Sequence, residues 1–153
     1  MQAKIVRSLT YNEVLRKISE IEEKNGWNSD AVYLNGKIFF DASKTEEYEE
    51  WRKLRDAIEA YGEGEGFDYY VEEELEFSKT ASSLTMKRLQ LIDFISKTRI
   101  NSINHLASKI GRDVKNVYKD LKVLERTGLV RLIRRGNRRI PESAVKEITI
   151  LFY

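Results

Sequence analysis

The chain has 153 residues, with 27 lysines and arginines, 25 aspartates and glutamates, and no cysteine. The lack of cysteine excludes a disulfide framework and a thiolate metal site. Because no apolar run has the length of a signal peptide or of a membrane span of ~20 residues, we expect a cytoplasmic protein. Residues 1–80 carry a net charge of −8 and residues 81–153 one of +10, which indicates a polyanion-binding module joined to a module with another role.

The first part of the chain, residues 1–78, predicts a small acidic α+β domain. Residues 3–6 are an apolar run that suits an edge strand. Thr10 and Glu13 have the spacing of a capping box, in which each side chain accepts a hydrogen bond from the other residue's backbone N–H. A helix should therefore follow, and an Asn-Gly pair at 25–26 ends it.

Three further elements complete this domain. Residues 31–40, AVYLNGKIFF, are two apolar runs around an Asn-Gly pair, which predicts a tight hairpin. Ser43 or Thr45 caps a second helix that extends to Tyr61, and apolar residues alternate from 67 to 77 as in a strand. We expect this domain to supply a dimer surface or to bind a protein partner.

Residues 78–83, SKTASS, are small and polar and coincide with the change of charge, so they predict a linker. Residues 84–153 then form the second domain. Its first helix is capped by Thr85 and ends near Lys97. The apolar face of this helix should point inward and consists of Leu89, Ile92 and Ile95. Leu91 and Phe94 widen this apolar face.

Two more helices follow, joined by a turn at Gly111. Asn101 or Ser102 caps the first of them, and Asp113 caps the second, which ends at Gly128. Each of the three helices has one apolar face. These faces must be buried against each other, which gives a small three-helix core.

After the third helix the apolar period changes to that of strands. Residues 129–133 and 138–140 predict a hairpin with Gly136-Asn137 at its turn. The last segment, 141–153, begins with Pro-Glu-Ser, which favours a helix, but its end, ITILFY, suits a strand equally well. Three helices followed by a hairpin are the outline of a winged helix-turn-helix.

The third helix, residues 113–126, predicts a DNA-contacting surface. Its cationic side chains fall along one line, opposite its apolar side: Lys115, Lys119, Lys122 and Arg126. Arg112, Asn116 and Tyr118 lie at its N-terminal turn, which in a recognition helix meets base edges. Lysine suits phosphate, whereas arginine and asparagine can make paired hydrogen bonds to guanine and adenine. Tyr118 lies between the two sides, and could pack in the core or reach a phosphate or a thymine methyl.

The hairpin carries a second basic cluster, made of Arg131, Arg134, Arg135, Arg138 and Arg139. Arginines on a hairpin beside a recognition helix suit a wing that follows the DNA backbone or enters a minor groove, and we expect the four from 134 to 139 to contact DNA. The alternative is a solvated hairpin whose charges protect a sheet edge.

The segment from Leu84 to Ile140 resembles a family of MarR-like winged-helix DNA-binding proteins of archaea and bacteria. The residues that carry the resemblance are Thr85, Arg88 and Leu89, then Gly111, Arg112, Asp113, Asn116 and Val117, then Leu124, Gly128 and Leu129. The resemblance implies a winged helix-turn-helix regulator. It also allows an antitoxin-like repressor, encoded beside a toxin.

No residue pattern indicates an enzyme, a metal site or a cofactor. His105 is the single histidine and should be exposed, and a catalytic triad or a histidine metal site would need companions. The acidic runs at 46–50 and 72–76 suit solvated faces. The glycines at 62, 64 and 66 alternate with glutamates that would repel a phosphate.

We therefore expect an α+β protein with a C-terminal winged helix-turn-helix and an acidic N-terminal domain. Its predicted function is sequence-specific binding of double-stranded DNA as a transcriptional regulator, specifically a repressor. It should act as a homodimer, because one module makes few base contacts. The alternative function is an antitoxin-like interaction module whose acidic domain binds a basic protein.

Overall fold

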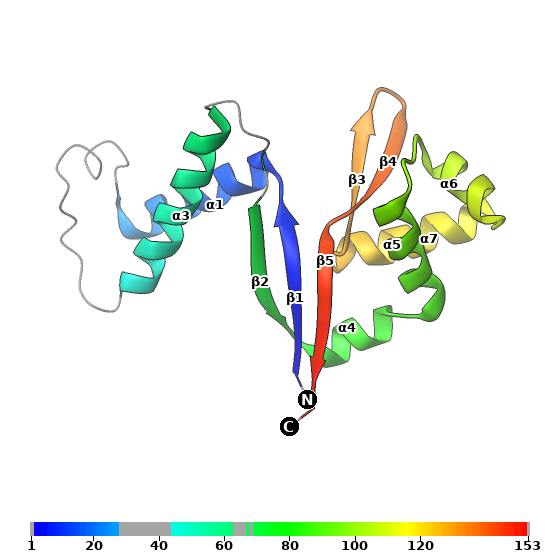
Figure 1. Cartoon of the computed structure of the whole chain (residues 1–153), viewed down its shortest axis with the longest axis horizontal. Coiled ribbons are helices and arrows are strands. Elements are labelled where there is room, and N and C mark those ends of the chain that lie inside the picture. Colours follow the sequence, from blue (N-terminus) through cyan, green and yellow to red (C-terminus); the bar gives the residue numbers. More distant parts are fainter. Residues whose placement is uncertain (1, 28–43, 63–66, 68, 153) are drawn as a thin grey trace. The chain divides into compact units, whose positions relative to one another are not determined.

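The computed structural model describes residues 2–27, 44–62, 67 and 69–152 (Figure 1). The elements in chain order are β1 Gln2–Leu9, α1 Tyr11–Asn25, α3 Thr45–Gly62, β2 Tyr69–Leu75, α4 Phe77–Ser83, α5 Met86–Lys97, α6 Ile103–Ile110, α7 Val114–Arg126, β3 Val130–Arg135, β4 Arg138–Ser143 and β5 Val145–Leu151. The hairpin predicted at 31–40 lies outside the described residues. No helix in the described part of the chain is long and apolar enough to span a membrane.

The chain divides into two compact units. Unit 1 consists of Met1–Ser8 and Tyr70–Tyr153, and unit 2 consists of Leu9–Tyr69. Their net charges are +9 and −7. The division differs from the predicted boundary between 78 and 84, because the N-terminal strand β1 pairs with the C-terminal strand β5 and so belongs to unit 1.

The β1–β5 pairing decides how the last segment folds. β1 lies between β2 and β5 in a three-stranded sheet, and Ile5 is opposite Ile148 in the antiparallel β1–β5 ladder. The segment 141–153, left open between helix and strand, is therefore strand from Val145 to Leu151. Pro141 lies inside β4, opposite Leu132. A proline is tolerated there because, among the strands that the structure describes, β4 has β3 as its one neighbour, and the proline nitrogen needs no partner on the outer edge.

The helices α5, α6 and α7 and the β3–β4 hairpin surround one core in unit 1 (Figure 1). This order of elements is that of a winged helix-turn-helix, as the sequence predicts. The core also contains Ile5 of β1, so the sheet and the helices share it. On α5 the buried residues are Leu91, Ile92 and Ile95, whereas Leu89 is 38% exposed, which corrects its predicted inward position.

Residues 78–83 are not a linker. They belong to helix α4, which connects β2 to α5. Thr80 and Ser83 are buried, and the Ser83 hydroxyl donates a hydrogen bond to the Thr80 carbonyl over 2.8 Å. One side of this short helix is thus packed through Thr80 and Ser83, a tertiary effect that overrides the weak helix preference of the segment.

Unit 2 is built on α1 and α3. The predicted capping box at Thr10 and Glu13 is confirmed, with both hydrogen bonds present. Lys24 of α1 lies 2.9 Å from Glu47 of α3, and this hydrogen bond is the largest cause that lowers the pKa of Glu47. Trp51 is buried and donates from Nε1 to Glu22 over 3.0 Å. The packing of α1 against α3 therefore combines the buried indole of Trp51 with polar contacts between the two helices.

Candidate nucleic-acid interface

The turn between α6 and α7 fixes where the third helix begins. Gly111 has φ +65°, a left-handed conformation that strains residues with a side chain, and its N–H bonds the Ala107 and Ser108 carbonyls. Asp113 then caps α7, because its carboxylate accepts hydrogen bonds from the N–H groups of Lys115 and Asn116. Both predicted boundary residues are confirmed, so the sequence at 111–113 sets the helix start locally.

Helix α7 has one buried side and one cationic side. Val117, Leu121 and Leu124 are fully buried in the core. The side chains of Lys115, Lys119 and Arg126 are exposed on the opposite side, as the helical wheel predicts. Lys122, on the same line, is half-buried and lies 2.7 Å from Glu125. The buried side anchors the helix, and the cationic side stays accessible.

The first turns of α7 present two uncharged polar groups. The Asn116 side chain is exposed, and Tyr118 is 40% exposed. Tyr118 therefore does not belong to the core, which removes one of the two alternatives for this residue. An exposed amide and a phenol beside a row of lysines can read base edges or bind phosphate.

Arg112 has a different environment. Its Nη2 lies 2.7 Å from Asp120 Oδ2, and 22% of its side chain is exposed. Arg88 of α5 contacts the other oxygen of the same carboxylate over 3.1 Å. The structure thus places Arg112 in an ion pair along the flank of α7, where the sequence predicted a base contact.

The β3–β4 hairpin places four arginines at its tip. Arg134 is opposite Arg139, and Arg135 is opposite Arg138, and all four are exposed. Gly136 has φ +61° and Asn137 has a negative φ, a combination that matches a type II′ turn. Since cross-strand partners share a face, two arginines point to each side of the hairpin.

Arg131 lies at the base of the hairpin and has a structural role. Its guanidinium donates to the hydroxyl and the carbonyl oxygen of Ser8 at the end of β1, and 18% of its side chain is exposed. It also lies 4.0 Å from Glu142, its partner across the ladder. The fifth arginine of the hairpin cluster therefore ties the hairpin to β1 and does not belong to the exposed tip.

A groove of about 510 Å³ contains a basic residue that the sequence analysis did not single out. Arg99 lies in the connection between α5 and α6, and lines the groove together with Asn101, Arg135 and Arg138. Ile133 and Ile140, a cross-strand pair of the hairpin, also line it. The contact between the connection and the hairpin is long-range, so spacing along the chain gave no signal for Arg99.

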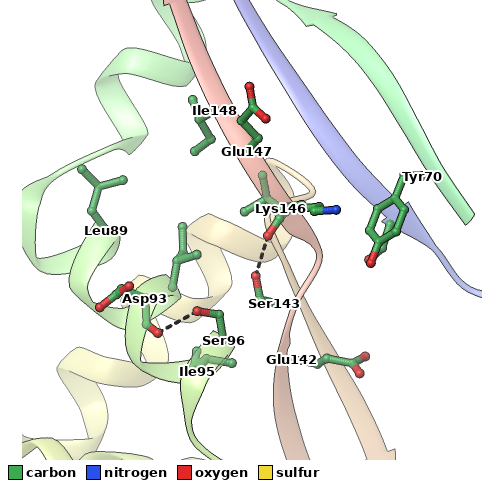
Figure 2. A pocket seen from close by; sticks show the side chains of 13 residues that line it. Tyr70, Leu89, Asp93, Ile95, Ser96, Glu142, Ser143, Lys146, Glu147 and Ile148 are labelled. Atoms are coloured by element: carbon green, nitrogen blue, oxygen red, sulfur yellow. Dashed lines mark hydrogen bonds between the residues drawn. The ribbon is translucent and has the colours of Figure 1, made fainter. Parts of the chain in front are cut away.

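A second groove of about 690 Å³ lies between α5 and the end of β4 with β5 (Figure 2). Figure 2 shows Leu89 and Asp93 of α5 on one side and Lys146 and Ile148 of β5 on the other. The Lys146 ammonium lies 4.6 Å from the centre of the Tyr70 ring. None of the predicted DNA-contacting residues lines this groove, so it is separate from the basic surfaces.

His105 is half-buried, which corrects the predicted exposed position. Its ring Nδ1 accepts a hydrogen bond from the Asn101 backbone N–H over 3.1 Å, and the backbone N–H of His105 donates to the Ser102 hydroxyl over 3.0 Å. The histidine thus stabilises the start of α6.

In the part of the chain that the structure describes, no three His, Cys, Asp or Glu residues are placed to hold a metal ion.

Comparisons with known proteins gave a family model that matches the C-terminal part of the chain and a solved structure of low similarity. A family model described as HVO_A0114 matches residues 83–150, which is less than half of the chain. No curated protein matches the sequence. A solution NMR structure of the homodimeric winged helix-turn-helix DNA-binding domain (fragment 1–100) of Mb0332 from Mycobacterium bovis, a possible ArsR-family transcriptional regulator, is 17% identical with a TM-score of 0.41. The match covers 71% of this chain and 76% of that chain, and at this level of similarity it carries no argument about function.

Proposed function

We propose that the protein is a transcriptional regulator that binds double-stranded DNA through unit 1. The observation that carries this proposal is the pair of exposed cationic surfaces, on α7 and on the β3–β4 hairpin, in a unit with a net charge of +9. Neutralising phosphates with lysine and arginine releases counterions, and this term supplies a large share of the affinity of DNA-binding proteins. Unit 2, with a net charge of −7, is not suited to that role.

In this proposal α7 enters the major groove. Its buried side packs on α5 and α6, so the opposite side, with Lys115 and Lys119, faces the DNA. Asn116 is the residue best suited to read a base, because its amide can pair with adenine, while the lysines hold phosphates. The four tip arginines of the hairpin follow the flanking backbone or enter the minor groove.

We also propose that the protein is a repressor and that it binds DNA as a homodimer. One α7 helix offers few base contacts, and a two-fold pair that reads two half-sites about 34 Å apart is the usual route to specificity. Sedimentation with and without DNA tests the dimer. A single protein chain on the shortest bound duplex would overturn it.

The test of DNA binding uses charge-matched variants. Lys119→Gln removes an exposed lysine from α7, and Lys53→Gln removes an exposed lysine from α3 of unit 2. We expect the first variant to bind duplex DNA about tenfold more weakly and the second to bind like the parent protein. Equal effects of the two substitutions, or no binding by the parent protein at low salt, would reject the proposal.

A second candidate function concerns the acidic unit 2. A net charge of −7 over Leu9–Tyr69 suits a surface that holds a basic protein, as an antitoxin-like regulator would. Co-purification from the native host in low salt tests this role. Repeated recovery of the protein alone would count against it.

A further inference from the structure

The carboxylate of Asp120 is held by two arginines from different parts of the chain. Its Oδ1 lies 3.1 Å from Arg88 Nε, and its Oδ2 lies 2.7 Å from Arg112 Nη2. About a fifth of each arginine side chain and 16% of the Asp120 side chain are exposed. Each oxygen therefore has its own guanidinium, and the group is largely shielded from water.

These three residues join four segments of unit 1. Asp120 lies in the middle of α7, Arg112 in the turn before it, and Arg88 in the first turn of α5. The Nη1 of Arg88 also donates to the carbonyl of Ser83, the last residue of α4, over 3.1 Å. We call Arg88, Arg112 and Asp120 the α7 clamp, because the contacts tie α7 to its preceding turn, to α5 and to the end of α4.

The position of Asp120 on α7 explains why a clamp is needed. At about 100° per residue, Asp120 lies about 60° from the buried Val117 and about 100° from Lys119. It is thus on the flank of the helix, between the core and the cationic side. A carboxylate free in this position would repel DNA phosphates, whereas two bound guanidinium groups offset its charge.

We infer that the α7 clamp fixes the orientation of the recognition helix on DNA, and that Arg112 and Arg88 are positioning residues that do not contact the DNA themselves. The inference rests on the proposed function and changes the role of Arg112 in it. Base readout depends on holding side chains to within about half an ångström, so a helix that can rotate on its core loses affinity even with all its lysines present.

Salt titrations separate positioning from contact. Each phosphate contact contributes about 0.9 to the slope of log affinity against log salt concentration. We expect Arg112→Gln and Arg88→Gln to weaken duplex binding about tenfold at each salt concentration with the slope unchanged. Lys119→Gln, which removes the same charge from the cationic side, should lower the slope by about 0.9. A similar loss of slope for Arg112→Gln would show that Arg112 contacts phosphate, and would overturn the inference.

A double-mutant cycle tests the clamp without DNA. Urea unfolding of Arg88→Gln, Asp120→Asn and the double variant should show coupling of about tenfold in the unfolding equilibrium constant, since the two side chains share one contact. Arg88→Lys retains the charge and should recover part of the affinity for DNA. Additive effects on unfolding would overturn the clamp.

The two measurements distinguish the clamp from the proposed function. If the cycle shows coupling but the parent protein does not bind DNA, the proposed regulator and the positioning role are both rejected. The clamp would then be a structural ion pair. DNA binding by the parent protein with no effect of Arg88→Gln would reject the inference alone. Asp120→Asn keeps the shape of the side chain, so the folded state of that variant can be checked by circular dichroism before either measurement.

Discussion

Arg134 and Arg139 lie directly opposite each other in the β3–β4 ladder, and both are exposed. Like charges at directly opposed positions destabilise a strand pair. The next pair toward the tip, Arg135 with Arg138, repeats the arrangement. The hairpin therefore carries a charge pattern that works against its own folding, which is expected of a surface shaped by a polyanionic partner.

Removing one charge from this pair should raise stability and lower DNA affinity. For Arg139→Gln we expect the free energy of unfolding to rise by about 0.2–1 kcal/mol, because the repulsion across the ladder is relieved. DNA affinity should fall, with a loss of about 0.9 in the salt slope. Urea unfolding and a duplex titration measure the two effects. A variant that is less stable and binds as before would contradict this account of the hairpin.

Arg99 should behave like a member of the hairpin cluster. It lines the same groove as Arg135 and Arg138, although it lies before α6 in the chain. We expect Arg99→Gln and Arg135→Gln to weaken DNA binding to a similar extent, with Lys53→Gln in unit 2 as the control. A titration in which Arg99→Gln binds like the control would show that DNA does not reach this groove.

Gly111 allows a matched pair of variants. Gly111 and Gly26 both have φ +65°, both end helices, and an added Cβ would meet no atom within 4 Å at either position. An alanine at either position should therefore cost about 1–2 kcal/mol from backbone strain alone. Because Gly111 precedes α7 and Gly26 lies in unit 2, only Gly111→Ala should also weaken DNA binding. Equal effects on binding would contradict the assignment of the interface to unit 1.

Unit 2 is inserted between two neighbouring strands of unit 1, β1 and β2. Replacing residues 9–69 with a short turn should leave a folded unit 1, because the β1–β5 pairing and the core around α5–α7 remain. Since the residues removed carry a net charge of −7, we expect DNA binding to be retained or strengthened. Gel-shift titrations of the shortened and full-length chains measure this. Loss of binding by a folded shortened chain would show that unit 2 is required, for example to hold a dimer together.

The helix-turn-helix and the hairpin could be predicted because their signals are local. The caps at Ser102 and Asp113, the turn at Gly111 and the Gly136-Asn137 pair each act within a few residues. The cationic side of α7 followed from helical periodicity in the same way. These features need no knowledge of the rest of the chain.

The remaining features depend on contacts between distant residues. Nothing near Ile5 indicates that it pairs opposite Ile148, so the sequence placed β1 in the wrong unit and left β5 undecided. The contact of Arg88 with the Asp120 carboxylate required the packing of α5 against α7, whereas Arg112 reaches the same carboxylate from the turn before α7. The helical wheel does not show which side chain an arginine will pair with, so the sequence assigned Arg112 to DNA along with the exposed lysines.

The central claim is that unit 1 binds duplex DNA through its exposed cations, and the salt dependence of binding tests it most directly. Eight predicted cations remain on α7 and the hairpin, of which Lys122 is half-buried and the other seven are exposed: Lys115, Lys119, Lys122, Arg126, Arg134, Arg135, Arg138 and Arg139. If half of them contact phosphates, log affinity should fall with log salt concentration with a slope of about −3.6 per chain. An affinity for duplex DNA that hardly changes between low and physiological salt would contradict the claim.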